Sequence, residues 1–434
     1  MLSASDNEML TRVGRGTPMG DLMRQYWLPA VQSAELPDAD SDPLRVRLLG
    51  EDLIMFRDTR GKIGLLANSC SHRGASLFYG RNEEGGLRCV YHGWKYDITG
   101  QCLDMPSEPA ESNFKDKIKA RAYPCTEKAG MIWAYMGPRE TPPEMPHFEW
   151  TELPEDQFVV TPALRACNWM QALEGDIDTS HLYFLHGRLN PDDSPALGVY
   201  HQDRHPHLEI IHTDYGIVYG ASRDEADATT YWRITQFGFP IFTLFPMNDD
   251  GGVPGHMWTP LDDTHTLVWT VIWNPTRAKS DWAYSSLGIG RGDRDHLENT
   301  TEGLGRWRMR ANKANDYLID RDLQRTKTFT GIPTIPMQDQ AMNESMGAIY
   351  DRTNEHLGTS DSMVIQVRRR LIRAAAELRD HGTIPPGVDN PEWYDYRSAS
   401  GTLPKGESWI DGFGDWIYGR SNVVPEVNLR VTER

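Results

Sequence analysis

The organisation of this chain follows from two short stretches, Cys70-Ser71-His72-Arg73-Gly74 and Cys89-Val90-Tyr91-His92-Gly93-Trp94. Each stretch has one cysteine and one histidine, and a glycine follows the histidine within two residues. Glycine adopts backbone conformations that other residues avoid, so each stretch predicts a tight loop. Such a loop can present backbone N–H groups, one sulfur and one imidazole to a metal centre.

Two thiolates and two imidazoles suit a [2Fe–2S] cluster of the Rieske type. In that cluster two histidines replace two cysteines on one iron, which raises the reduction potential. A zinc site is the alternative, but zinc ribbons usually pair Cys-x-x-Cys knuckles, and zinc fingers keep their cysteines together and their histidines together. Here Cys70 is grouped with His72, and Cys89 with His92, which favours the Rieske cluster.

A second set of candidate metal ligands follows in the stretch Asp178-x-x-His181-x-x-x-x-His186. A site that activates dioxygen at Fe(II) uses two histidines and one carboxylate on one face of the metal. Two histidines near an aspartate are common in ordinary helices, so the motif gains its meaning from occurring together with the cluster loops. His181 and His186 are about 140° apart around a regular helix, so we expect the helix to end or widen between them.

The carboxylate ligand is not settled by spacing. Asp178 is too close to His181 to be a comfortable third ligand, and we expect it to accept a hydrogen bond from the imidazole instead. The third ligand must then come from an acid after the predicted sheet. The candidates are Glu302, Asp316, Asp320, Asp322, Asp339, Glu344 and Asp351.

Together these motifs resemble those of the Rieske non-haem iron aromatic-ring oxygenases. The resemblance also includes Asn168-Trp169-x-Gln171-x-x-Glu174-Gly175, and it extends from Asp6 to about residue 380. Its nearest group is the phthalate-dioxygenase-like family, which includes aromatic carboxylate hydroxylases and O-demethylases. The resemblance implies an oxygenase (alpha) component that holds a [2Fe–2S] Rieske cluster and a mononuclear Fe(II).

The resemblance also implies roles for single residues. Gln338-Asp339 lies in a stretch similar to the family's third-ligand segment, so Asp339 is the expected ligand, with an acid that caps the next helix as the alternative. In the family the aspartate equivalent to Asp178 reaches a cluster histidine, here His92 of the partner subunit. That contact needs a closed ring of subunits, so we expect a homotrimer or a pair of stacked trimers.

Composition is that of a globular protein with an acidic surface. The chain has 434 residues and a formal net charge of −17, which disfavours nucleic acid and anionic membrane surfaces as partners. Its N-terminus lacks the basic start and apolar run of a signal peptide, and no stretch reaches the roughly 18 apolar residues of a membrane helix. The odd number of five cysteines argues against a disulfide framework. We therefore expect a cytoplasmic protein.

The pattern of short strands and helices predicts an α+β chain with an antiparallel β Rieske domain, followed by a catalytic domain with a curved antiparallel sheet flanked by helices. The expected segments are an N-terminal helical segment at 1–26, the Rieske domain at 27–140, the catalytic iron domain at 155–382 and an irregular tail at 383–434.

Three arginines are candidates for substrate contacts. Arg204, Arg223 and Arg233 could each pair with a substrate carboxylate, and Arg223 is the first choice, with a surface salt bridge as the alternative. The run Arg368-Arg369-Arg370 is most simply a solvated helix face. The histidines at 201, 205, 207 and 212 have no known ligand spacing and are most simply surface or pocket groups.

The resemblance therefore implies a terminal oxygenase that uses O₂ to hydroxylate a substituted aromatic carboxylate. Oxidative O-demethylation of a methoxylated, lignin-derived acid is an alternative, and a Rieske electron carrier with a binding domain is an alternative of another class. The chain has no Gly-x-Gly-x-x-Gly motif after a strand and no four-cysteine ferredoxin set, so electrons from NAD(P)H must arrive through a separate reductase or ferredoxin.

Overall fold

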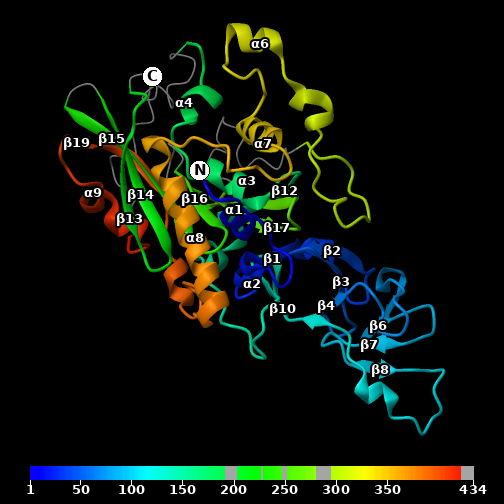
Figure 1. Cartoon of the computed structure of the whole chain (residues 1–434). Helices are drawn as coiled ribbons and strands as arrows, with labels where there is room; N and C mark the ends of the chain where they lie inside the picture. Colours follow the sequence, from blue (N-terminus) through cyan, green and yellow to red (C-terminus); the bar gives the residue numbers. More distant parts are fainter. Residues whose placement is uncertain (191–202, 226–227, 247–251, 280–294, 422–434) are drawn as a thin grey trace.

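The computed structural model describes residues 1–190, 203–225, 228–246, 252–279 and 295–421. A smaller, all-β part lies at one end of the molecule and a larger part of helices around a sheet lies at the other (Figure 1). This arrangement confirms the predicted α+β class with an antiparallel sheet in each part. Among the described residues, no helix combines the length and the apolar character that a bilayer-spanning helix needs.

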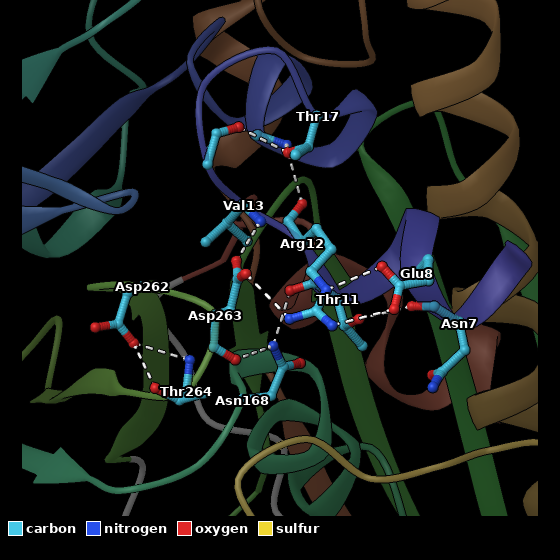
Figure 2. Close-up of polar contacts among 12 residues, drawn as sticks. Asn7, Glu8, Thr11, Arg12, Val13, Thr17, Asn168, Asp262, Asp263 and Thr264 are labelled. Carbon is cyan, nitrogen blue, oxygen red and sulfur yellow. Dashed lines mark hydrogen bonds and ion pairs between the residues drawn. The ribbon is translucent and has the colours of Figure 1, made fainter. Parts of the chain in front are cut away.

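Two short helices open the chain, α1 (Ala4–Thr11) and α2 (Pro18–Met23), each capped by a hydroxyl side chain. The residues between them bind the start of the catalytic domain. Asn168 donates hydrogen bonds to the carbonyl oxygens of Thr11 and Asp263, and the Val13 N–H donates to the Asp263 carboxylate (Figure 2). The N-terminal segment thus connects helix α3 to the turn between two strands of the large sheet.

The all-β part contains three small antiparallel sheets. The first has the order β1-β11-β10, the second β2-β3-β4-β9 and the third β5-β6-β7-β8. Their bounds are β1 (Trp27–Gln32), β2 (Leu44–Leu48), β3 (Glu51–Arg57), β4 (Ile63–Ala67), β5 (Arg81–Glu83), β6 (Gly86–Arg88), β7 (Lys95–Tyr96), β8 (Cys102–Asp104), β9 (Ala122–Tyr123), β10 (Cys125–Lys128) and β11 (Met131–Tyr135).

The larger part is built on one antiparallel sheet of order β12-β18-β17-β16-β15-β14-β13, with β19 paired to β15. The strands are β12 (Phe158–Arg165), β13 (His207–His212), β14 (Gly216–Asp224), β15 (Thr229–Gly238), β16 (Phe242–Leu244), β17 (Val253–Pro260), β18 (Thr266–Trp273) and β19 (Ala399–Pro404). The helices are α3 (Trp169–Asp176), α4 (Leu182–Leu185), α6 (Arg321–Thr326), α7 (Ile335–Ser345), α8 (Ser362–His381) and α9 (Trp409–Ile417).

The predicted irregular tail at 383–434 is wrong where the structure describes strand β19 and helix α9. Strand β15 is ten residues long, and β16 pairs only with its C-terminal end. Its N-terminal half is therefore free to pair with β19, a strand whose own sequence, Ala-Ser-Gly-Thr-Leu-Pro, has weak strand propensity. The buried residues of α9, Trp409, Phe413, Trp416 and Ile417, do follow helical spacing.

A buried network of charges holds α3 against α8. Glu174 on α3 accepts from Arg352 at 3.0 Å and from Arg368 of α8 at 2.6 Å, and Arg368 also pairs with Glu355. Both arginine side chains are at most 4 % exposed, so the predicted solvated helix face is wrong for Arg368. Burial opposes the ionisation of Glu174, but the two arginines outweigh it and lower the pKa of that carboxyl.

We expect Glu174→Gln to reduce the free energy of unfolding by about 3 kcal/mol, because it leaves two buried guanidinium groups under-compensated. Since the folded-state pKa is lowered, the contribution of Glu174 is present above about pH 4.3 and is lost as the pH falls through the folded-state value. The variant should therefore lose less stability than the wild type on acidification. Denaturant unfolding at several pH values measures both effects.

Glu8→Gln is the matched control. Glu8 pairs with Arg12 in an exposed i,i+4 contact, and such pairs contribute less than about 1 kcal/mol. Equal losses of unfolding free energy in Glu174→Gln and Glu8→Gln would contradict the conclusion that the buried network stabilises the fold more than an exposed ion pair does.

Candidate functional site

The two cysteine–histidine loops have the same backbone hydrogen bonds. In each, the glycine N–H donates at 2.9 Å to the carbonyl of the cysteine four residues earlier, and the cysteine N–H donates at 2.8 Å to the carbonyl five residues later. Gly74 and Gly93 have φ values of +77° and +78°, as the predicted tight loops require. A Cβ atom at Gly93 would lie only 2.5 Å from Pro106.

These loops place the two cysteines beside each other and the two histidines beside each other. The sulfurs of Cys70 and Cys89 are buried and interact, and burial together with the Cys70 neighbour raises the pKa of the Cys89 thiol. The rings of His72 and His92 have centroids 4.4 Å apart at the surface. A Rieske cluster needs this arrangement, with two sulfurs on one iron and two imidazoles on the other.

The zinc alternative does not fit this arrangement. Four ligands about 2.0–2.3 Å from one zinc ion must all lie close together. Within the described part of the chain, the trio whose ligand atoms all lie within 4.8 Å of one another is His181, His186 and Asp339, and no three of the loop ligands meet that limit. A single zinc ion therefore does not account for the four loop ligands in this arrangement.

The trio forms the second site. The Nε2 atoms of His181 and His186 are 3.1 Å apart, and Asp339 Oδ1 lies 3.9 Å and 3.4 Å from them. Donors with these separations can bind a single metal ion at bond lengths of about 2.1 Å. Two imidazoles and one carboxylate on one side of an ion are the donor set of non-haem Fe(II) oxygenases.

The helix that precedes the histidines ends at a different place from the predicted one, and this brings the two histidines together. Helix α3 ends at Asp176, before both histidines, and the histidines flank the single turn α4. His186 is the C-cap of α4, so the 140° separation expected in a continuous helix does not apply. Gly187 permits the close turn that follows, because a Cβ there would lie 1.9 Å from the Tyr183 carbonyl oxygen.

Each histidine is oriented by a polar neighbour. Asp178 Oδ2 lies 3.4 Å from His181 Nδ1, and Gln338 Oε1 lies 2.7 Å from His186 Nδ1. The Gln338 amide N–H donates to the Ile332 carbonyl, so its oxygen faces the ring and must accept the Nδ1 proton. Both Nε2 lone pairs are thus directed toward Asp339. The role of Gln338 was missed from sequence, although it directly precedes Asp339.

Electrostatics favour a charged carboxylate at this site. Burial opposes the ionisation of Asp339, but His186 and then His181 outweigh it and lower the pKa of Asp339 to about 2. The pKa of Asp178 is also lowered, because its hydrogen bond with His181 outweighs burial. Both acids are therefore anionic at neutral pH.

The other third-ligand candidates lie away from the two histidines. Glu344 is buried, but it accepts hydrogen bonds from the Ala166 N–H, Gln340 and Tyr317. The rest are exposed at the surface: Glu302, Asp316, Asp320, Asp322 and Asp351.

The structure also locates Arg223 and Arg204, two of the three predicted substrate arginines. Arg223 is 2 % exposed, so the surface position of the salt-bridge alternative is wrong. Its guanidinium donates to the Thr179 carbonyl at 3.0 Å and so supports the loop beside Asp178. Arg204 is exposed and its guanidinium lies 4.2 Å from the Tyr183 ring centre. Among the clustered histidines, those at 205, 207 and 212 are exposed, and the one at 201 lies outside the described residues.

A cavity of about 770 Å³ adjoins the trio. Asp178, His181 and Asp339 line it, together with three exposed apolar side chains, Phe184, Met342 and Met346. His181 and Asp339 are thus accessible from an open, partly apolar hollow, whereas His186 is buried behind them.

Both parts of the chain match known protein families. Residues 26–124 match the family described as Rieske [2Fe-2S] domain, and residues 134–413 match the family described as LigXa C-terminal domain like. The chain is 43 % identical to the 3-chlorobenzoate-3,4-dioxygenase oxygenase subunit of Comamonas testosteroni, over 96 % of this chain and 99 % of that protein.

Two further relatives are the phthalate 4,5-dioxygenase oxygenase subunit of Pseudomonas putida (37 % identical, 87 % of each chain) and the 5,5'-dehydrodivanillate O-demethylase oxygenase subunit of Sphingobium sp. (31 % identical, 86 % of this chain and 80 % of that one). The solved structure of NdmA from Pseudomonas putida CBB5 has the same fold, with a TM-score of 0.59 at 19 % identity over 86 % of this chain and 96 % of that one.

Three observations point to the same family. The two loops suit a Rieske cluster, the histidine–carboxylate trio suits a mononuclear iron, and the similarity to known proteins spans nearly the full chain. The chain belongs to the Rieske non-haem iron oxygenases, among the oxygenase subunits whose catalytic domain is LigXa C-terminal domain like.

Proposed function

We propose that this protein is the terminal oxygenase that hydroxylates a substituted aromatic carboxylate, using O₂ and electrons from NAD(P)H. The observation that carries the proposal is the convergence of His181, His186 and Asp339 on a chain that also has the cluster loops. Its similarity to the 3-chlorobenzoate-3,4-dioxygenase subunit supports an aromatic acid as substrate. In this proposal the trio holds Fe(II), and the Rieske cluster is held by Cys70, His72, Cys89 and His92.

The bound cluster would supply single electrons, and the bound iron would supply dioxygen activation. The chain's own contribution is to hold the ligands in place. Asp178 and Gln338 keep the Nδ1 protons of the two histidines, so each Nε2 lone pair is free for the metal. Asp339 remains ionised and buried beside them.

Oxidative O-demethylation is the second candidate, because one relative is a 5,5'-dehydrodivanillate O-demethylase subunit. A methoxy carbon placed where a ring carbon would otherwise lie would be hydroxylated and released as formaldehyde. The trio disfavours a pure electron carrier, which has no need of a second metal site.

The purified chain should contain about three irons, two in the cluster and one at the trio. With a reductase and NADH it should consume oxygen on a panel of benzoate-type, phthalate-type and methoxylated acids, and formaldehyde release identifies demethylation. His181→Ala should retain two irons and a reducible cluster but form no product, whereas the exposed His212→Ala should behave as wild type. Two irons in the wild type would indicate an electron carrier.

Electron transfer between the two sites is proposed to occur between chains. Within one chain, β6, β7 and β8 beside the cluster loops lie at the opposite end of the molecule from α4 and α7 (Figure 1). The second cluster loop exposes Val90 and Tyr91, each 58 % accessible, and the hollow beside Asp178 exposes Phe184. Apolar groups on both surfaces support the insertion of one chain's cluster loops into the partner's hollow, as a trimer or stacked trimers allow.

If Asp178 bridges to His92 of the partner subunit, Asp178→Asn should retain its mononuclear iron and a reducible cluster. Product in a single turnover should nevertheless fall by about 100-fold, since the path for electrons is interrupted. Metal analysis, cluster reduction and single-turnover product yield measure the three properties separately. Iron loss as the main defect would mean that Asp178 only supports His181, and the exposed Asp351→Asn should show neither defect.

The proposed ring predicts a particle of at least three chains of 49.4 kDa, or about 148 kDa. Tyr91→Asp should dissociate it and remove activity together, because a charge is then buried in the contact. Light scattering coupled to size exclusion gives the mass. Ile410→Asp changes an exposed side chain on α9 and should leave the mass unchanged; a fully active monomer would overturn both the bridge and the ring.

A further inference from the structure

Residues 114–121, here called the basic segment, form a positive patch on the Rieske part. They follow β8, at the end of the molecule opposite to α4 and α7 (Figure 1). The segment contains one acid, Asp116, and four bases, Lys115, Lys117, Lys119 and Arg121, all of them exposed. Arg121 pairs with Glu51 at 2.9 Å, but within the described part of the chain the three lysines have no ion pair. A chain with a net charge of −17 thus has a local excess of positive charge here.

The basic segment is held against the strands beside the cluster loops. The Cys102 N–H donates to the Ile118 carbonyl at 3.1 Å, and the Ile118 side chain packs against the core that contains both cluster cysteines. The Ala67 N–H donates at 2.8 Å to the carbonyl of Arg121, and Ala67 lies only three residues before Cys70. The positive side chains are therefore held in place near the first cluster loop.

Aromatic rings connect the basic segment to one of the cluster ligands. Phe114, the first residue of the segment, is 42 % exposed, and its ring meets the Trp94 ring edge-on with centroids 6.1 Å apart. Trp94 is buried and stacks on the His72 imidazole, with centroids 4.5 Å apart and planes 11° apart. Two ring contacts therefore lead from a side chain at the surface to a histidine of the cluster.

The two cluster histidines have different surroundings. His72 contacts the buried Trp94, whereas the His92 ring lies beside the exposed Tyr91 with centroids 3.9 Å apart. In the proposed ring of chains, His92 and Tyr91 face the hollow of a partner. A separate electron carrier cannot dock on a loop tip that this contact covers, so electrons must enter the cluster from another surface. The basic segment offers such a surface on the side of His72.

We propose that the basic segment is the docking surface for an acidic, ferredoxin-type carrier of single electrons. Opposite charges steer an acidic carrier to this patch and orient it, while the net negative charge of the chain disfavours docking elsewhere. One electron leaves the reduced carrier and enters the cluster along Phe114, Trp94 and His72, and no bond forms or breaks. This inference rests on the proposed supply of electrons by a separate carrier, and it does not depend on which aromatic acid is the substrate.

The test uses an acidic plant-type [2Fe–2S] ferredoxin as the probe and follows reduction of the cluster in the full, cluster-loaded chain by rapid mixing. Such a ferredoxin has a lower potential than a Rieske centre, so the transfer is downhill. The second-order rate constant of the wild type should fall as ionic strength rises. Lys117→Glu combined with Lys119→Glu should lower that constant by about 30-fold at low ionic strength and weaken its dependence on salt.

Lys313→Glu combined with Lys405→Glu is the matched control, because it makes the same change of net charge with exposed lysines of the catalytic part. Its rate constant should stay close to that of the wild type. Dithionite should reduce the cluster fully in every variant, with an unchanged visible spectrum. Equal losses in the two double variants, or a wild-type rate that ignores ionic strength, would overturn the docking surface. A changed particle mass in the Lys117 and Lys119 variant would also overturn it, because the segment would then be a contact between chains.

Phe114→Leu separates docking from electron transfer. It retains an apolar side chain and every charge, so the dissociation constant of oxidised ferredoxin, measured by calorimetric titration, should match that of the wild type. The limiting rate of cluster reduction at saturating ferredoxin should fall several-fold. Tyr79→Leu removes an exposed ring of the Rieske part outside the stack and should change neither quantity. An unchanged limiting rate in Phe114→Leu would overturn the proposed path. A chain that accepts electrons in this way but oxidises no aromatic acid would support the docking surface and contradict the proposed function instead.

Discussion

The position of helix α3 is the constraint on which both the catalytic trio and its surroundings depend. Three polar side chains at i, i+3 and i+6 bind three different parts of the molecule. Asn168 binds the N-terminal segment and the β17–β18 turn, and Gln171 donates to the carbonyl oxygens of Asn343 and Gly347 at the end of α7. Glu174 pairs with the buried arginines that include Arg368 of α8.

These contacts explain how the trio is assembled from distant segments. The histidines follow α3 directly, whereas Asp339 lies on α7, more than 150 residues later. Gln171 fixes the distance between α3 and α7, so it fixes indirectly the distance between the histidines and Asp339. A buried charged network is a costly way to join two helices, but it resists sliding because displacement would leave charges unpaired.

The Rieske part is attached to the same framework. Arg47 of β2 donates to Asp262 in the β17–β18 turn at 2.7 Å, and Arg24 after α2 pairs with Glu51 of β3 at 2.8 Å. The orientation of the cluster loops within a chain therefore depends on the same turn that receives Asn168 (Figure 2). A rigid attachment of this kind suits the proposed contact, in which the cluster loops of one chain reach the site of a partner.

The sequence by itself determined the cluster loops and the pair of histidines, because in each case the ligands lie within a few residues and local backbone geometry places them. It also determined the α+β class through strand and helix periodicity. Only the tertiary structure decided that α3 ends before both histidines and that Gln338 orients His186. It also decided that β19 pairs with the half of β15 that the short strand β16 leaves unpaired. The tertiary structure also decided that Arg165 is buried with no ion pair among the described residues, whereas Arg368 is buried with two glutamates. The reason is physical: burial and charge pairing depend on which distant segments meet, and an arginine has the same sequence signature in all of these environments.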